Sequence, residues 1–176
     1  MIAKIIFITG GAKSGKSSFA EKLASALGKN VIFLATAEAL DKEMADRIKK
    51  HKAKRSSTWK TVEEPININI LNKFKNFKGA VILDCVTLWV SNMIHKFGIE
   101  GAEDRILEDI QMLLKTARTS RFTLIVVSNE LGMGIVPENR LAREFRDIAG
   151  RCNQLIARMA DEVYLMISGI ELKIKG

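Results

Sequence analysis

The strongest constraint on the fold lies in residues 5–17, which read Ile-Ile-Phe-Ile-Thr-Gly-Gly-Ala-Lys-Ser-Gly-Lys-Ser. A short apolar run rich in β-branched residues predicts a buried strand. From Gly10 onward the spacing is that of a phosphate-binding loop. The segment that follows is amphipathic and predicts a helix, with apolar residues on one face at Phe19, Ala20, Leu23, Ala24 and Leu27. The strand, loop and helix stand in the order that the motif requires, which argues against an ordinary glycine-rich turn.

The chemistry of phosphate binding explains why these residue types are needed. Glycines allow the backbone to turn tightly, so that successive N–H groups point at an anion and the helix N-terminus adds its partial positive charge. In such a loop Lys16 reaches the β- and γ-phosphates, and the Ser17 hydroxyl binds Mg²⁺. The sequence therefore predicts a nucleotide-binding protein.

Length and composition limit the domain organisation and the partners. With 176 residues, of which 47% are hydrophobic, residues 1–176 can form one well-buried domain but not two comfortable ones. The formal net charge of +8 and the pI of about 9.6 indicate anionic partners. Nucleotides, nucleic acid and acidic membranes all satisfy that condition.

The cysteines and the hydropathy pattern bear on the compartment. Cys85 and Cys152 have neither the spacing of a zinc site nor that of a disulfide framework, which favours a reducing compartment. The first residues lack the pattern of a signal peptide, and no apolar run approaches the roughly 18 residues of a membrane span. We expect a cytoplasmic protein that does not enter the membrane.

Further candidate site residues follow other predicted strands. Residues 31–35 form a second apolar run, and Ala35, Thr36 and Ala37 lie at its carboxyl end, where ligands bind in open α/β sheets. A plain strand-to-helix connection is an equally good interpretation of that segment. Residues 80–83 are apolar and precede Asp84, a position from which a carboxylate holds Mg²⁺ in phosphate-loop enzymes.

A fourth apolar run, residues 122–127, also ends in polar residues. Glu130 is thus a second carboxylate expected near the same end of the sheet and a further candidate Mg²⁺ ligand. The loop at residues 131–137 follows, and it is too apolar for a simple solvent-exposed turn. We expect it to pack over a ligand or against a neighbouring subunit.

Residues 47–55 carry a dense group of cations around His51. Sequence alone leaves three interpretations open. The segment can be a solvated helix face, which is the common case for such runs. It can contact nucleic acid, although it lacks the interleaved aromatic residues of single-strand binders. It can also fold back over the phosphate loop, where a neutral imidazole at His51 would be a good nucleophile toward phosphorus.

The remaining pattern completes the predicted fold. Residues 58–62 alternate like an edge strand, and two apolar runs joined by Ser168-Gly169 predict a terminal hairpin. Predicted helices cover about residues 41–55, 65–74, 86–97, 102–117 and 139–160. Together these elements predict an α/β protein with a three-layer P-loop NTPase fold, a mostly parallel sheet and a C-terminal β-hairpin.

Three stretches resemble a known family. They are residues 8–17, the Arg47-Ile48-x-x-His51-Lys52 block, and residues 129–140, which read Asn-Glu-Leu-Gly-Met-Gly-Ile-Val-Pro-Glu-Asn-Arg. All three are similar to the adenosylcobinamide kinase/adenosylcobinamide-phosphate guanylyltransferase family, as are residues 146–151 and 168–170. The resemblance spans essentially the whole chain, and the third stretch is its most specific part.

The resemblance implies a bifunctional enzyme of cobalamin biosynthesis. Such an enzyme phosphorylates adenosylcobinamide with a nucleoside triphosphate, ATP or GTP. It then transfers GMP from GTP to adenosylcobinamide phosphate, which yields adenosylcobinamide-GDP and pyrophosphate. The resemblance further implies a sheet similar to that of recombination-type (RecA-like) ATPases and a homotrimer with sites at subunit boundaries.

The resemblance also assigns roles to individual residues. His51 matches the family's histidine that carries GMP, and Lys16 is the second residue expected in catalysis. The implied nucleotide contacts are Gly10, Gly11, Ala12, Lys13, Ser14, Gly15, Lys16, Ser17, Ala35, Thr36, Ala37, Lys52, Ala53, Lys54, Arg55, Glu63 and Asp84. The chain departs from relatives at Lys13, where they carry Arg, and at Asp84, where some carry Glu.

An alternative from another class is a basic P-loop ATPase that acts on nucleic acid and grips phosphates with residues 47–55. It predicts ATP hydrolysis that nucleic acid stimulates and that salt suppresses steeply. The resemblance favours the cobinamide enzyme, with no nucleic-acid partner.

Overall fold

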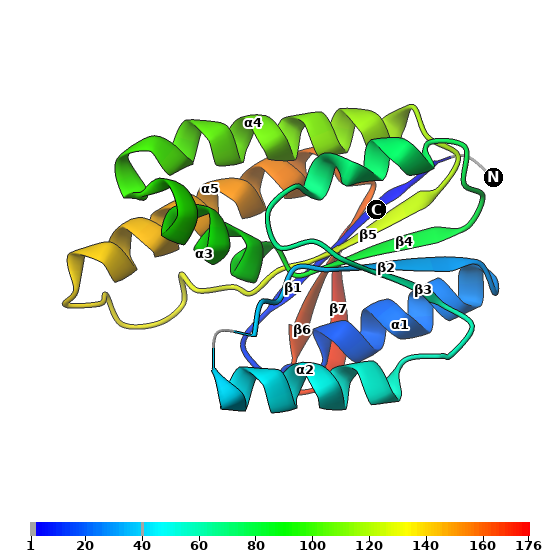
Figure 1. Cartoon of the computed structure of the whole chain (residues 1–176), viewed down its shortest axis with the longest axis horizontal. Coiled ribbons are helices and arrows are strands. Elements are labelled where there is room, and N and C mark those ends of the chain that lie inside the picture. The colour runs from blue at the N-terminus through cyan, green and yellow to red at the C-terminus, as the bar shows by residue number, and fades with distance from the viewer. Residues whose placement is uncertain (1–2, 40) are drawn as a thin grey trace.

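A single twisted sheet organises the computed structural model, which describes residues 3–39 and 41–176 (Figure 1). The strands are β1 (Ile5–Gly10), β2 (Val31–Ala35), β3 (Lys60–Glu63), β4 (Ala80–Asp84), β5 (Thr123–Val127), β6 (Glu162–Ile167) and β7 (Ile170–Lys175). The helices are α1 (Lys16–Leu27), α2 (Lys42–Lys54), α3 (Val86–Phe97), α4 (Ile99–Arg118) and α5 (Arg140–Met159), and η1 (Ile68–Phe74) is a 3₁₀ helix.

The sheet has seven strands in the order β3-β2-β4-β5-β1-β6-β7. All neighbouring strands are parallel except β6 and β7, which form the terminal antiparallel hairpin. Parallel strands covered on both faces are apolar throughout, which is why β1, β2 and β5 are fully buried runs. The predicted α/β fold with a mostly parallel sheet is confirmed, and one strand separates β1 from β4.

Helices cover both faces of the sheet and make three layers. Figure 1 shows α3, α4 and α5 on one side and α1 and α2 on the other. The larger core lies under α3, α4 and α5 and includes the fully buried Trp89, whose indole N–H donates to the Ile66 carbonyl over 2.6 Å. The smaller core lies under α1 and includes Phe19 and Phe33.

Element boundaries agree with most of the sequence predictions. Asp41 caps α2 by accepting the Met44 amide over 2.7 Å, and Asn139 caps α5 by accepting the Ala142 amide over 3.1 Å. Two details were wrong. Helix α4 already begins at Ile99, directly after Gly98, which has φ of +75°.

The second difference concerns the helix predicted over residues 65–74. It is the 3₁₀ helix η1, which begins only at Ile68. The Glu64 carboxylate accepts the amides of both Ile66 and Asn67, over 3.1 and 2.9 Å, which holds the preceding residues in a turn. A side chain that binds nearby backbone donors competes with regular helix formation.

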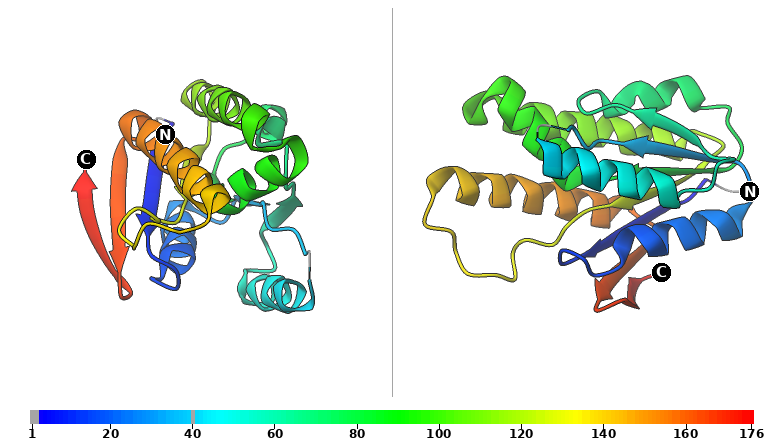
Figure 2. Two further views of the ribbon diagram at one scale, coloured as in Figure 1. Left: turned by 90° about the vertical axis from the view of Figure 1, so that its left-hand side faces the viewer. Right: turned by 60° about the horizontal axis from the view of Figure 1, so that its bottom comes forward.

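Helix α2 is the least buried of the helices that border the carboxyl end of the sheet. Figure 2 shows it standing apart from the body of the molecule. Among its described side chains only Met44 and Ile48 are half-buried, and the others are exposed. Its attachment to the rest of the fold is therefore shallow.

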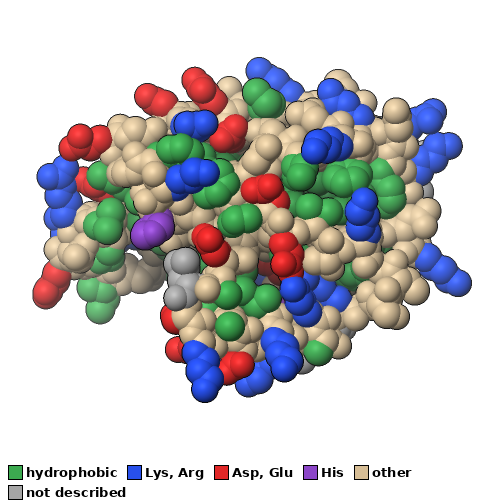
Figure 3. All heavy atoms as spheres, viewed as in Figure 1, with side chains coloured by type: hydrophobic (Ala, Val, Ile, Leu, Met, Phe, Trp, Pro, Cys, Tyr) green, Lys and Arg blue, Asp and Glu red, His purple; other side chains and the backbone are tan. Residues whose placement is uncertain are grey.

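Charge and hydropathy on the surface limit the kinds of partner. On the face shown in Figure 3, Lys and Arg side chains are scattered over the surface and its edges instead of forming one stripe. None of the helices in residues 3–39 and 41–176 is both long and apolar enough to cross a membrane.

Candidate functional site

A cavity of about 640 Å³ opens at the carboxyl end of the parallel strands. Its size falls within the range of small-molecule sites. The phosphate loop, the ends of β2, β4 and β5, and one face of α2 surround it. The lining residues are Ala12, Lys13, Ser14, Gly15, Lys16, Ser17, Ser18, Ala35, Ala37, Ala39, Met44, Arg47, Ile48, His51, Lys52, Arg55, Glu63, Asp84, Cys85, Leu88, Val127 and Asn129.

The phosphate loop has the backbone that its glycines predict. A Cβ on Gly10, where φ is +146°, would lie 2.4 Å from the Met166 carbonyl oxygen, so only glycine fits there. Gly15 has φ of +96° and precedes α1 without any side-chain cap. The first amides of α1 therefore remain available to an anion at the helix N-terminus.

Lys16 is a buried cation pointed at the loop. Its Nζ donates to the Gly11 carbonyl over 2.6 Å and reaches the Ser14 hydroxyl at 3.5 Å. Burial lowers the pKa of Lys16, and the nearby Cys85 and Asp84 oppose that shift. A cation that has lost much of its hydration is suited to bind the phosphates of a nucleotide.

Ser17 and Asp84 meet across the cavity and suit a Mg²⁺ ion. Burial raises the pKa of the Asp84 carboxyl, whereas its hydrogen bond with the Ser17 hydroxyl lowers it. Electrostatic interactions with the nearby His51, Arg55 and Lys16 side chains lower the pKa of Asp84 further. Mg²⁺ in nucleotide sites takes one or two protein oxygens besides phosphates and waters, which fits this pair. In the described part of the chain no group of three or more His, Cys, Asp or Glu side chains is placed to hold a metal.

Glu130, the other carboxylate expected to bind Mg²⁺, is not brought to that pair. Its Oε1 accepts the Gly132 amide over 2.7 Å, and Glu130 does not line the cavity. The carboxylate supports the loop after β5 instead. The fit to Mg²⁺ therefore depends on Ser17 and Asp84.

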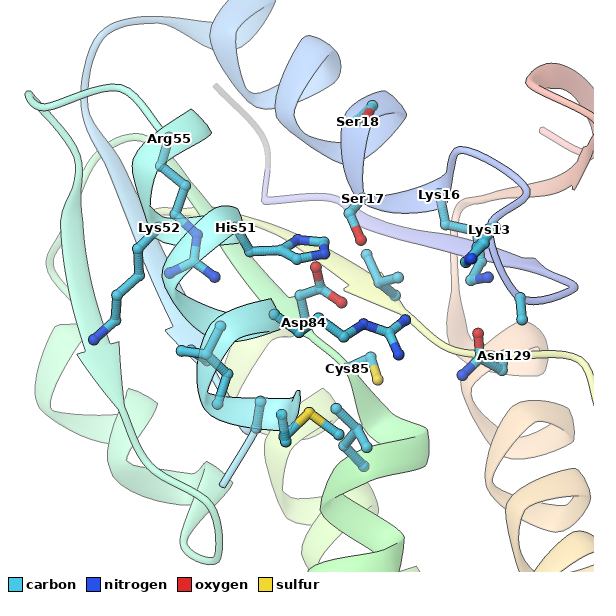
Figure 4. A pocket seen from close by; sticks show the side chains of 18 of the residues that line it. Lys13, Lys16, Ser17, Ser18, His51, Lys52, Arg55, Asp84, Cys85 and Asn129 are labelled. Atoms are coloured by element: carbon cyan, nitrogen blue, oxygen red, sulfur yellow. The ribbon is translucent and has the colours of Figure 1, made fainter. Parts of the chain in front are cut away.

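Helix α2 brings His51 to the phosphate loop within the same chain. Met44, Arg47, Ile48, His51 and Lys52 line the cavity at successive helical spacings of three and one, so they share one face of α2. Figure 4 shows the His51 imidazole directed toward Ser17 and Asp84. Of the three interpretations of residues 47–55, this geometry matches the one in which the segment folds back over the loop.

Lys52 and Arg55 have different surroundings. The Lys52 ammonium forms an ion pair with Glu63 at the end of β3. The Arg55 guanidinium lies 3.6 Å from the centre of the Phe33 ring. Two of its nitrogens, Nε and Nη1, are buried without a hydrogen-bond partner, and burial lowers the Arg55 pKa against the attraction of Asp84. Buried guanidinium nitrogens without a hydrogen-bond partner indicate a place for an anionic ligand.

The segment after β2 contributes only part of what we expected. Ala35 and Ala37 line the cavity, but Thr36 is fully buried beside it. The Thr36 hydroxyl donates to the Cys85 carbonyl over 2.7 Å and accepts the Cys85 amide over 2.8 Å. Its side chain thus joins the ends of β2 and β4 and does not face a ligand.

Of the other predicted nucleotide contacts, some line the cavity and some do not. Residues 12–17, Glu63 and Asp84 line the cavity, whereas Gly10, Gly11 and Ala53 do not. Gly10 and Gly11 shape the loop behind it. The side chain of Lys54 lies outside the described residues.

Asn129 is a cavity residue that the sequence analysis did not single out. Its backbone N–H donates to the Thr87 hydroxyl over 2.7 Å, and its backbone carbonyl accepts from the Asn153 side-chain amide over 3.1 Å. These bonds come from α3 and α5, so the tip of β5 is fixed from both sides. The available signal was its place directly after a buried strand and beside Ser128.

The reactivity of the Cys85 thiol tests whether the part of the cavity that Cys85 lines is closed to reagents in solution. Burial and the neighbouring Asp84 raise its pKa to about 12, and burial raises that of Cys152 to about 12 as well. At pH 8 both thiols are therefore protonated and should react at least about a hundredfold more slowly with iodoacetamide than in urea-unfolded protein. Mass spectrometry of timed samples measures both rates. Rapid alkylation of Cys85 in the folded protein would contradict this description of the cavity.

Fold and site together define a P-loop nucleotide-binding protein with a histidine placed beside the phosphate loop. The comparison with family models identifies the family. Residues 6–174 match the model described as cobinamide kinase / cobinamide phosphate guanyltransferase. The chain belongs to this family of bifunctional kinase and guanylyltransferase enzymes.

Curated relatives agree along nearly the whole chain. The bifunctional adenosylcobalamin biosynthesis protein CobU of Escherichia coli is 42% identical over 97% of this chain and 99% of its own length. The protein of the same name from Salmonella typhimurium is 43% identical over the same shares. The bifunctional adenosylcobalamin biosynthesis protein CobP of Pseudomonas aeruginosa is 37% identical over 96% of both chains.

Solved structures agree in fold. The RadB recombinase matches with a TM-score of 0.54 at 15% identity, over 93% of this chain and 74% of that one. A KaiC-like protein from Pyrococcus horikoshii matches with a TM-score of 0.51 at 15% identity, over 93% of this chain and 70% of that one. At such low identity these matches support the P-loop NTPase fold alone.

Proposed function

We propose that this enzyme acts on adenosylcobinamide in two steps of cobalamin biosynthesis. It first transfers the γ-phosphoryl group of ATP or GTP to the aminopropanol hydroxyl of adenosylcobinamide. It then transfers GMP from GTP to adenosylcobinamide phosphate through a guanylylated His51. The products of the second step are adenosylcobinamide-GDP and pyrophosphate.

One observation carries the proposal: the phosphate loop, the Ser17–Asp84 pair and His51 all line a single cavity of one chain. A triphosphate held by the loop and Lys16 would lie within the same cavity as the imidazole. Phosphoryl transfer alone does not require a histidine there, because that reaction needs positioning and charge stabilisation but no covalent intermediate. A nucleophile in the cavity is what a transfer in two halves requires.

In the first half of guanylyl transfer, a ring nitrogen of His51 forms a bond to the α-phosphorus of GTP. The bond from that phosphorus to the bridging oxygen breaks, and the electron pair leaves with pyrophosphate. Lys16 and Arg55 stabilise the charge that develops on the departing and equatorial oxygens. In the second half, a phosphate oxygen of adenosylcobinamide phosphate attacks the α-phosphorus, and the bond to His51 breaks.

In the kinase step, the substrate hydroxyl oxygen forms a bond to the γ-phosphorus, and the bond from that phosphorus to the bridging oxygen breaks. The electron pair leaves with the nucleoside diphosphate, and the hydroxyl proton passes to solvent. The backbone amides of the loop and Lys16 hold the triphosphate in line with the attacking oxygen. Mg²⁺, held by Ser17 and Asp84, would neutralise phosphate charge in both reactions.

We also propose a cytoplasmic homotrimer of one-domain subunits. The continuity of one sheet from β3 to β7 supports a single domain over residues 1–176. Self-association is supported by the edge hairpin, where large apolar side chains are exposed at Ile167, Ile170, Leu172 and Ile174. An apolar edge strand left open to water favours pairing with another chain.

A nucleic-acid-stimulated ATPase is less well supported. Two of the cations that it would use are directed to other places, since Lys52 pairs with Glu63 and Arg55 lines the nucleotide cavity. The basic residues on the face in Figure 3 also form no continuous stripe of the kind that follows a nucleic-acid backbone.

Product analysis tests the proposed function directly. Purified protein is incubated with Mg²⁺ and adenosylcobinamide, with GTP or with ATP, and the corrinoids are separated by chromatography and identified by mass. We expect adenosylcobinamide phosphate with either or both nucleotides, and adenosylcobinamide-GDP with GTP only. If no corrinoid product forms with either nucleotide, the proposed function is wrong.

A further inference from the structure

We infer that the loop after β5 and the start of α5 hold the corrin ring of the acceptor substrate. The apolar side chains concerned are Met133, Ile135, Val136 and Leu141, which we call the loop surface. This inference rests on the proposed function, because it names the part of the protein that recognises adenosylcobinamide and its phosphate.

The segment that leads into the loop surface begins at the nucleotide cavity, which Asn129 lines. The Ser128 amide donates to the Ile8 carbonyl over 3.0 Å, and the Glu130 amide donates to the Gly10 carbonyl over 2.9 Å. The tip of β5 is thus bonded to the strand that leads into the phosphate loop, and Asn129 lines the cavity there. A substrate that occupies the loop surface can therefore extend an arm past Asn129 toward a bound triphosphate.

The side chains of the loop surface are unusually open to water. Met133 is 81% exposed, Ile135 97%, Val136 60% and Leu141 54%. In Figure 3 the loop and the start of α5 form a lobe that carries hydrophobic side chains, and a hollow separates this lobe from the region of α2. Clustered apolar side chains exposed beside a polar site are typical of a surface that binds a ligand or partner.

Hydrogen bonds hold the loop in shape before any ligand arrives. At its start Glu130 accepts the Gly132 amide, and at its end the Arg143 guanidinium donates to the carbonyls of Pro137 and Glu138 over 2.9 and 2.6 Å. The cap by Asn139 fixes the first turn of α5. A surface that is already ordered loses less conformational entropy when it binds.

The chemistry of the acceptor selects this surface. A corrinoid is a broad, largely apolar macrocycle fringed by amides, with a flexible arm that ends in the reacting hydroxyl or phosphate. With a nucleotide in the cavity the ring has to remain outside, so it requires an apolar surface at the mouth. The exposed backbone N–H and C=O groups of the loop can form hydrogen bonds with the side-chain amides of the corrinoid, which are both donors and acceptors.

The other exposed apolar group on the described chain is less suited to the ring. Ile170, Leu172 and Ile174 lie along β7, whose open backbone edge favours a second chain. That hairpin also touches the phosphate loop, since the Gly169 amide donates to the Ser14 carbonyl over 3.0 Å. We therefore assign the hairpin to self-association and the loop surface to the corrinoid.

The test compares the double variant Met133→Ser/Ile135→Ser with Met112→Ser, in which a half-exposed apolar residue on α4 is changed in the same way. Steady-state kinetics give KM for adenosylcobinamide in the kinase step and for adenosylcobinamide phosphate in the transfer step. Labelling of the protein with α-³²P-GTP in the absence of corrinoid measures only the transfer of GMP from GTP to the protein. Light scattering reports the oligomeric state.

For the double variant we expect both corrinoid KM values to rise at least about tenfold, with KM for GTP, protein labelling and oligomeric state unchanged. The Met112→Ser protein should match the wild type in every measurement. Unchanged corrinoid KM values would overturn the inference. A change in oligomeric state would overturn it too, because the loop would then be an interface between copies.

Failure of the proposed function gives a different result. In that case the wild-type protein itself produces no phosphorylated or guanylylated corrinoid, and the inference about the loop is wrong with it. If the wild type turns over both corrinoids and only the variant comparison fails, the proposed function stands and the inference alone is overturned.

Discussion

Replacing His51 with alanine is expected to abolish guanylyl transfer and to leave the phosphorylation of adenosylcobinamide nearly intact. In the proposed mechanism the imidazole supplies the nucleophile for guanylyl transfer, whereas phosphorylation needs only positioning of the hydroxyl against a γ-phosphate. Loss of a nucleophile lowers the rate by roughly a thousandfold or more. Because His51 is exposed on α2, the change should not disturb the fold.

The protein is labelled with α-³²P-GTP, and the loss of the label is then measured in acid and in alkali. A phosphoramidate should be labile in acid and stable in alkali. His95→Ala is the matched control, since His95 is the only other histidine and is also exposed on a helix. Undiminished labelling of the His51→Ala protein would rule out the covalent route, as would the absence of label on the wild type.

Replacing Lys16 with methionine is expected to lower both activities by about 10²- to 10⁴-fold. The ammonium group lies in the loop beside the Gly11 carbonyl and supplies positive charge where the β- and γ-phosphates would bind. Methionine keeps much of the side-chain volume at this buried position, so the loss reflects charge more than packing. The two reactions share one triphosphate site in our proposal, and they should therefore fall together.

Two assays follow this variant, one for transfer of the γ-phosphoryl group to adenosylcobinamide and one for labelling of His51. Lys22→Met is the control, because Lys22 lies on the same helix with its side chain exposed. If Lys16→Met still labelled His51 at the wild-type rate, the phosphate loop could not be where GTP is cleaved.

The phosphate loop and its flanking elements were predictable from sequence because their signals are local. Gly10 and Gly15 adopt positive φ values, a buried strand precedes them and an amphipathic helix follows. The terminal hairpin and the capped starts of α2 and α5 were predictable for the same reason. Each of these features depends on residues that are close together in the chain.

The side chains that do not face the cavity as we expected are ones whose direction depends on distant partners. Thr36 follows β2 as expected, but its hydroxyl is bound by the backbone of Cys85 and so turns away from the cavity. Glu130 follows β5 as expected, but the Gly132 amide holds its carboxylate in the next loop. Asn129 was missed because Thr87 and Asn153, which fix it, come from separate helices.

The identity of His51 as a cavity residue could not be decided from its neighbours in sequence. A run of cations on a helix is usually a solvated face. What distinguishes α2 is that one of its faces lies over the phosphate loop, and that is a property of the connections to β2 and β3. The resemblance to a family supplied this information where periodicity could not.

The small buried contact between α2 and the rest of the fold has a consequence for the order of steps in catalysis. A helix that half-buries only Met44 and Ile48 among its described side chains, and pairs Lys52 with Glu63 in an exposed ion pair, should tilt away at little free-energy cost while the sheet stays folded. In the proposed mechanism, the His51 imidazole on such a helix could pass its GMP to the acceptor while the phosphate loop keeps its conformation. Departure of pyrophosphate and arrival of the corrinoid then need not compete for the same space at the same moment.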